Sequence, residues 1–186
     1  MVSITQGRNK VCKDGIGGLA KVYLFPYVKY SRSQIILNNN VLVTYPDTTI
    51  YEYEVNNNPS VSQNQSEENG SKFYNLNISL ELENENPNDF QKILNKDFNI
   101  IVKDRNNNFR FLGNVNGLEC NSVDFTTGSG KQDFSGVKLG FEGKEEKEAY
   151  YINNLQAAGF TISGTEPVLI LSSTDTLSST NLLSSI

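Results

Sequence analysis

The side chains that come closest to a catalytic arrangement are glutamates in two acidic stretches. They are Glu81, Glu83 and Glu85 in the first stretch, and Glu142, Glu145, Glu146 and Glu148 in the second. Two carboxyl groups flanking a bond can hydrolyse a glycoside, one as an acid and the other as a base or nucleophile. Alternate glutamates on an extended strand form a solvated face instead. We expect surface groups here, not a catalytic pair.

Other reactive arrangements are missing from the sequence. There is no histidine, which excludes a Ser-His-Asp or Cys-His nucleophile and a His-ligated zinc site. The run Gly128-Ser-Gly-Lys131 departs twice from a phosphate-binding loop, with Phe125 at the first glycine position and Gln132 at the Mg²⁺-binding position. We expect a hairpin loop there, and a chain that is not an enzyme and holds no cofactor or metal.

Size and composition indicate one β-rich domain over residues 1–186. Val, Ile, Thr, Phe and Tyr are frequent, and these residues favour strands. The formal net charge of −5 and the pI of about 4.8 argue against a protein that grips nucleic acid through its phosphates. No apolar run is long enough to span a membrane, and the N-terminus lacks the pattern of a secretory signal.

The two cysteines, Cys12 and Cys120, lie far apart and have no CxxC spacing. A single disulfide is one interpretation. We favour reduced, half-buried thiols in a protein assembled in the cytosol.

The stretch 72–143 organises the chain. Between 74 and 82 every second residue is apolar, from Tyr74 to Leu82, while Asn, Ser and Glu occupy the positions between; this period of two predicts a half-buried strand. A short helix is expected over 86–96, with Asn86 as its cap and Pro87 in its first turn. Strands over 98–104 and 109–113 follow, separated by an asparagine-rich turn.

The remaining strands are predicted from short apolar or alternating runs at 21–26, 33–37, 41–45, 49–55, 118–125, 137–142 and 167–172. The first is expected at a sheet edge because Pro26 cannot donate to a ladder. Residues 144–154 fit a short helix or an arm. Asparagine triplets at 38–40, 56–58 and 106–108 predict turns, since Asn tolerates left-handed backbone.

Two polar segments are predicted to lack regular structure. Residues 56–71 contain one aliphatic side chain and are expected to form a long exposed loop, either disordered or in contact with a neighbouring subunit. Residues 173–186 are rich in Ser and Thr and are expected to form an extended C-terminal arm.

A spaced pattern of core and turn residues resembles a family of small virion proteins from tailed phages of Bacteroidetes, the crAss-like phages included. The matching features are Cys12 with Gly17-Gly18, Lys72-Phe-Tyr, Ile101-Val-Lys-Asp104, Phe111-Leu-Gly113 with Asn116-Gly117, Thr127-Gly128, Asp133 with Gly136, and Leu139-Gly-Phe-Glu-Gly143-Lys-Glu145. The resemblance extends from Gly15 to about Ile152, with Cys12 just before it.

The resemblance implies a tail-tube-type fold: an antiparallel β-sandwich or barrel of two packed sheets with one short flanking α-helix and extended arms. It also implies a structural protein of the phage tail, assembled in the host cytoplasm as a six- or twelve-fold homo-oligomeric ring beside other tail or portal-proximal ring proteins. DNA would pass through the lumen without specific binding during ejection. Candidates for the acidic lumen are Glu52 and Glu54, or Glu81 and Glu83.

A different class of function stays open on the same residues. Tyr51 and Tyr53 share one face of the strand expected over 49–55. A β-sandwich with such an aromatic face is an alternative that attaches to capsid or to a host surface glycan.

Overall fold

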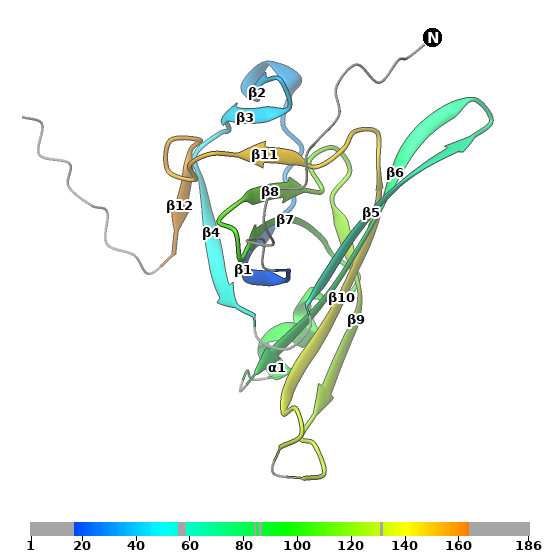
Figure 1. Ribbon diagram of the computed structural model, residues 1–186, viewed down its shortest axis with the longest axis vertical. Coiled ribbons are helices and arrows are strands. Elements are labelled where there is room, and N and C mark those ends of the chain that lie inside the picture. The colour runs from blue at the N-terminus through cyan, green and yellow to red at the C-terminus, as the bar shows by residue number, and fades with distance from the viewer. Residues whose placement is uncertain (1–16, 56–58, 84, 86, 131, 164–186) are drawn as a thin grey trace, which may run out of the picture.

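The protein is mainly β, with one large, mixed and mostly antiparallel sheet that does not close into a barrel (Figure 1). The computed structural model describes residues 17–55, 59–83, 85, 87–130 and 132–163. Its strands are β1 (Leu19–Pro26), β2 (Ile36–Asn38), β3 (Val41–Thr44), β4 (Thr48–Glu54), β5 (Ser60–Glu68), β6 (Ser71–Glu83), β7 (Asp97–Asp104), β8 (Phe109–Leu112), β9 (Leu118–Thr126), β10 (Gly136–Glu145), β11 (Tyr150–Ile152) and β12 (Phe160–Ile162).

The sheet has two halves that are joined at one corner. The long half-sheet is β9-β10-β6-β5, all antiparallel, and the compact half-sheet contains the other eight strands. Within the compact half, β1 lies between β4 and β7, and the pairs β11–β3 and β12–β4 are parallel. In the described residues, the halves are connected by strand pairing through two residue pairs of β7 and β9, Asp97 with Glu119 and Phe98 with Leu118.

The compact half-sheet is buried on both faces of its central strands. Along β7, Ile100 and Val102 face one hydrophobic cluster, which lies between the two half-sheets and includes Leu80 of β6. Ile101 faces a second cluster on the other side, where Phe111 packs against Phe160 with ring centroids 6.0 Å apart. Burial of large apolar side chains on both sides, at about 25 cal/mol per Å² of apolar surface, is the main term holding the strands together.

Most of the predicted strands are confirmed. The alternation from 74 to 82 is realised in β6, where Leu76, Ile78, Leu80 and Leu82 are at most 3% exposed. The first and third asparagine triplets form the expected turns, with positive φ at Asn39, Asn40 and Asn107. The strand expected over 167–172, the arm 173–186 and Cys12 lie outside the described residues.

The flanking helix is a correction. In place of a helix over 86–96, one α-helical turn (α1, Pro87–Phe90) is followed by a 3₁₀ turn (Gln91–Ile93), and no longer α-helix occurs in the described residues. Phe90 is buried in the cluster between the half-sheets and Ile93 packs against the same cluster. Two short turns are enough to pack these two apolar side chains, so a longer helix is not needed. Asn95 then has a φ of 57°, which ends helical geometry before β7 begins.

The long exposed loop over 56–71 is also a correction. Residues 60–68 form β5, which pairs with β6 over nine residues, from Ser60 with Ser79 to Glu68 with Ser71. The two-residue turn at Asn69 and Gly70 has φ angles of 50° and 77°, the left-handed geometry of a tight hairpin. The polar composition misled the prediction because β5 lies largely exposed at the sheet margin and needs no apolar face. Residues 56–58 lie outside the described part.

Three smaller expectations also differ from the structure. The strand expected over 33–37 is displaced, because Arg32–Gln34 form a 3₁₀ turn and β2 begins only at Ile36. β1 is not an edge strand: β4 pairs with it only as far as Leu24, so Pro26 ends the strand without facing that neighbour. Residues 144–154 form neither a helix nor an arm, because they complete β10 and form β11, which pairs with β3 and β8.

Candidate functional site

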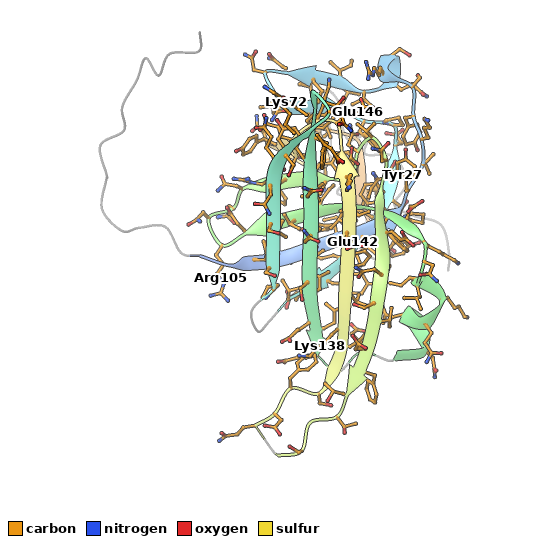
Figure 2. The ribbon with its side chains drawn as sticks, turned by 90° about the vertical axis from the view of Figure 1, so that its right-hand side faces the viewer. Tyr27, Lys72, Arg105, Lys138, Glu142 and Glu146 are labelled. Atoms are coloured by element: carbon orange, nitrogen blue, oxygen red, sulfur yellow. The ribbon has the colours of Figure 1, made fainter. Side chains whose placement is uncertain are left out.

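The most distinctive surface is the outer face of the long half-sheet, which we call the polar face. Its side chains lie opposite the apolar positions of β6 and β10, and none of the clusters covers them (Figure 2). The charged members are Glu68, Glu81, Glu83, Glu119, Asp124, Lys138, Glu142 and Lys144. Carboxylates outnumber ammonium groups, and the remaining positions are mostly Ser, Asn, Thr and Gly. This face is acidic, hydrophilic and built on regular strands.

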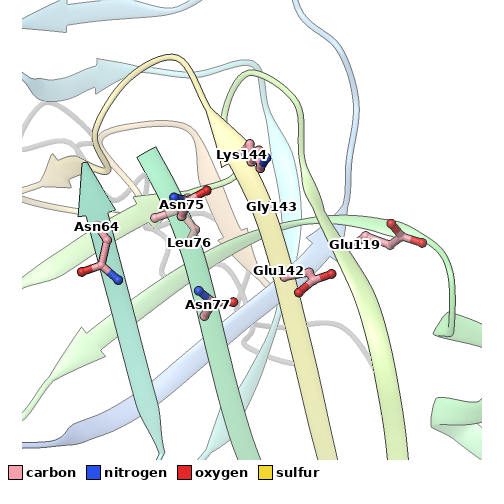
Figure 3. Close-up of a pocket in the computed structure, with 8 residues that line it drawn as sticks. All are labelled: Asn64, Asn75, Leu76, Asn77, Glu119, Glu142, Gly143 and Lys144. Atoms are coloured by element: carbon pink, nitrogen blue, oxygen red, sulfur yellow. The ribbon is translucent and has the colours of Figure 1, made fainter. Parts of the chain in front are cut away.

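A hollow of about 470 Å³ lies at the centre of this face (Figure 3). Asn64, Asn75 and Asn77 line it from β5 and β6, and Glu119, Glu142 and Lys144 line it from β9 and β10. Gly143 lines the hollow with its backbone, and a larger residue would not fit there because its Cβ would lie 2.7 Å from the Leu118 side chain. These amides and carboxylates can exchange hydrogen bonds with a polar partner, but they include neither a nucleophile nor an imidazole base.

The seven glutamates singled out in the sequence are dispersed, and one of them, Glu145, is buried instead of lying at the surface as predicted. Glu81 forms an ion pair with Lys138 across β6 and β10, with 2.6 Å between Oε1 and Nζ. Glu146 faces Arg32 at 3.6 Å, and Glu148 accepts a hydrogen bond from Asn40. Neighbouring glutamates therefore tie different elements together and do not converge on one point.

Glu145 has a structural role that the sequence did not indicate. Its side chain points to the inner side of β10 and is only 3% exposed. Its carboxylate accepts the backbone N–H groups of Val115 and Asn116, at 3.1 Å and 3.0 Å. Burial raises the pKa of Glu145 although these hydrogen bonds act in the opposite direction. The residue holds the β8–β9 connection against the end of β10.

Glu52 and Glu54 do not lie on the polar face. They sit on β4, where both contact Lys21 of β1, at 2.5 Å and 3.7 Å. The hydrogen bond that Lys21 donates to Glu52 is the largest of the effects that raise the pKa of Lys21. Of the two carboxylate pairs considered from the sequence, only Glu81 and Glu83 belong to the exposed sheet.

The tyrosines of β4 do not form an aromatic platform. Tyr51 is 49% exposed, but Tyr53 packs against Phe90, with ring centroids 5.8 Å apart, beside the cluster between the half-sheets. The two rings are therefore in different surroundings. A flat ligand would find one exposed ring on this strand.

The loop that resembles a phosphate-binding sequence is closed by its own aspartate. The carboxylate of Asp133 accepts hydrogen bonds from Ser129 N, Ser129 Oγ and Gly130 N, which lowers the pKa of Asp133. The backbone N–H groups that would bind a phosphate are thus occupied by an anion of the protein. The segment is the β9–β10 hairpin loop, as predicted.

Two strand margins border the polar face. β5 ends the strand order and pairs only with β6 among the described residues. On the other side, β9 contacts β7 through Leu118 and Glu119 and the 93–96 segment through Cys120, while residues 121–126 have strand partners only in β10. Both margins leave backbone groups available for a further strand.

The described residues contain no cluster of three or more His, Cys, Asp or Glu side chains able to hold a metal ion. No helix in the same ranges is long and apolar enough to cross a membrane. Cys120 is a buried free thiol, and burial raises its pKa to about 11. No protein-family model matches the chain, and no curated protein or solved structure matches it either.

Proposed function

We propose that this chain is a structural subunit of a phage tail that assembles into a ring around the path of the genome. The proposal combines the resemblance of its sequence to tail proteins of Bacteroidetes phages with one structural observation. That observation is the polar face, a four-stranded, acidic sheet surface bounded on both sides by strands with free margins. The subunit would take the tail-tube-type arrangement, with barrel closure achieved between copies rather than within one chain.

The margins of the long half-sheet support assembly. An exposed strand edge is normally blunted by lysine, proline or a bulge, because it would otherwise pair with another chain. β5 runs for nine residues from Ser60 to Glu68 without lysine, proline or a bulge, and its charged residues, Glu67 and Glu68, lie at one end only. Pairing this edge with residues 121–126 of the next copy would extend the sheet around a ring through a heterologous interface.

The chemistry of the polar face suits a conduit. DNA adheres to proteins chiefly through lysine and arginine contacts to its phosphates. On this face Lys138 is paired with Glu81, and Lys144 lies 5.2 Å from the centre of the Phe73 ring. A lumen in which carboxylates outnumber ammonium groups would let DNA slide without specific binding.

In this role the protein belongs to the virion and forms a cyclic homo-oligomer, six- or twelve-fold, stacked against other tail or portal-proximal ring proteins. It needs no cofactor and no membrane. The alternative, attachment to capsid or host glycan through Tyr51 and Tyr53, is weakened because Tyr53 packs against Phe90.

Paired cysteines on the two margins test this assembly. In a Cys12→Ser background, a chain carrying both Asn64→Cys and Asp124→Cys is treated with a flexible bismaleimide and examined on a denaturing gel. We expect a ladder of covalent multimers that ends at the ring size seen by electron microscopy. Each single variant is expected to give no ladder, because a heterologous contact brings together two different edges.

The control is Thr161→Cys paired with Asp124→Cys, since Thr161 lies on β12 in the compact half-sheet, away from the β5 margin. If the margin variants stay monomeric under the reagent and electron microscopy shows only single subunits, the ring proposal is wrong. Multimers linked equally well through Thr161 would show that the contact does not depend on the β5 margin.

A further inference from the structure

The short strand β2 exposes large apolar side chains that no other described part of the chain covers. Ile36 is 54% exposed and Leu37 is 36% exposed, although neighbouring residues of a strand point to opposite faces. Val43 of the adjacent strand β3 is 45% exposed. β2 also ends the strand order, so its outer backbone edge has no strand partner in the described part of the chain. The hairpin thus combines an open edge with apolar side chains on either side of it.

A groove continues from this hairpin towards the β8–β9 connection. It encloses about 220 Å³ and is lined by Ile35, Leu37, Val115 and Tyr150, together with the polar side chains of Arg32, Asn114 and Lys147. Arg32 is paired with exposed Glu146, whereas Lys147 has no ion-pair partner among the described residues. The lining of the groove is therefore largely apolar and carries a net positive charge.

One segment of the chain has matching chemistry. Residues 167–171 read Pro-Val-Leu-Ile-Leu, an uninterrupted apolar run in a sequence otherwise rich in polar residues. Glu166 and Asp175 flank it, and residues 164–186 contain neither Lys nor Arg. Valine, leucine and isoleucine suit a strand that is covered on both faces. Its acidic flanks complement the cations of the groove.

We propose that residues 167–171 of a second copy add as a strand to the outer edge of β2 and place apolar side chains over Leu37 and into the groove. The mode is strand addition, in which backbone hydrogen bonds supply affinity and side-chain pockets supply specificity. This contact joins two copies through residues 167–171 and involves neither the β5 margin nor the β9 margin.

The direction of the chain favours a second copy over the same one. β12 runs parallel to β4, with Ile162 opposite Ile50, so the chain leaves β12 towards the Glu54 end of β4, whereas β2 lies beyond the other end (Figure 1). Three residues separate Ser163 from Pro167 and span about 13 Å when fully extended. To reach β2 of its own copy, the segment would have to pass back along β4, cross the β3–β4 connection and cover two strand spacings of about 4.8 Å each. That path is longer than the three linking residues can span.

Site-specific cross-linking of the full chain tests the contact. Two preparations in a Cys12→Ser background are mixed, one carrying Asn38→Cys on β2 and the other Val168→Cys, and treated with a bismaleimide. Cys120 is buried with a raised pKa, so it does not compete for the reagent. We expect a covalent dimer in the mixture and at least a fivefold lower yield when Leu169→Asp accompanies Val168→Cys. Thr161→Cys on β12 replaces Val168→Cys as the control and is expected to give no dimer.

A chain carrying both Asn38→Cys and Val168→Cys separates the two possible sources of the segment. Linked multimers support the contact between copies. An internal link that leaves the mass of a monomer would overturn the assignment to a second copy, and the absence of any link would overturn docking on β2. Because Leu169→Asp leaves β5 and β9 unchanged, cross-links between Asn64→Cys and Asp124→Cys are expected to persist in that variant, so failure here is distinguishable from failure of the ring.

Discussion

Glu145 accepts the backbone N–H of Asn116 at 3.0 Å, while the Asn116 side chain donates to the carbonyl of Lys144 at 2.8 Å. This exchange fastens the β8–β9 connection to the last residues of β10, at the end of the long half-sheet. The Glu145 carboxylate is buried, accepts backbone N–H groups and has no paired cation among the described residues. Loss of this acceptor therefore leaves several N–H groups without a partner.

Replacing Glu145 by alanine is expected to lower the free energy of unfolding by about 2–4 kcal/mol, because the N–H groups of Val115 and Asn116 lose their acceptor inside the protein. Chemical denaturation of the two proteins measures this difference. Glu142→Ala on the exposed side of the same strand is the matched control and should change stability by less than about 0.5 kcal/mol. Equal effects of the two substitutions would contradict the structural role of Glu145.

The raised pKa of Glu145 predicts a pH dependence with a definite sign. The folded protein retains a proton on this carboxyl at pH values where the unfolded chain has lost it, so its contribution to stability is full below the unfolded value of 4.5 and declines as pH rises through the folded pKa. The Glu145→Gln variant cannot ionise at this position. Its free energy of unfolding relative to that of the wild type should therefore increase as the pH rises through the folded pKa of Glu145. Melting temperatures of both proteins between pH 4 and 8 test this; parallel curves would contradict it.

Gly159 and Gly70 both have positive φ, at 102° and 77°, but their surroundings differ. A Cβ on Gly159 would lie 2.3 Å from the carbonyl oxygen of Tyr45, whereas nothing lies within 4 Å of one on Gly70. Gly70→Ala should cost about 1 kcal/mol from backbone strain alone. Gly159→Ala should cost at least about 2 kcal/mol more, because β12 must separate from the β3–β4 connection. Thermal or urea unfolding of the pair measures the difference.

Reversing charges on the polar face should create DNA retention. Glu81→Lys combined with Glu142→Lys replaces two carboxylates by ammonium groups, and we expect measurable binding of double-stranded DNA at low salt where the wild type shows none. Between 50 and 200 mM salt the affinity should fall by about 3–4-fold for each phosphate contacted. Glu54→Lys with Glu146→Lys makes the same change in net charge away from this face and should bind much less. Gel-shift titrations compare the variants, and equal binding would assign no special role to the face.

Sequence reasoning succeeded where side-chain period and burial coincide. The strand from 74 to 82 was predictable because its apolar residues face a core and its polar residues face solvent, so one pattern encodes both the element and its orientation. The turns at Asn39, Asn40 and Asn107 were predictable for a local reason, the tolerance of asparagine for left-handed backbone.

It failed where structure depends on a neighbour. β5 has almost no apolar residues and is a strand because β6 offers it an edge; the signal that could have revealed it is Asn69-Gly70, a tight-turn pair between two extended runs. β12 is three residues long, and its parallel pairing with β4 arises from long-range packing. The polar face could be anticipated at Glu81 and Glu83, but its partners on β9 and β10 depend on register across strands that no local pattern supplies.

β7 separates two interiors that share a single strand. Ile100 and Ile101 are covalent neighbours, yet their side chains enter different clusters on opposite sides of the backbone. Methyl resonances from these two isoleucines would thus act as independent reporters: one would sense a disturbance beneath the long half-sheet and the other a disturbance beside β12. If the resonance of one isoleucine changes on heating while that of the other does not, one cluster has loosened before the other. The protein would then unfold in two steps, and β7 would stay packed against the intact cluster after the first step.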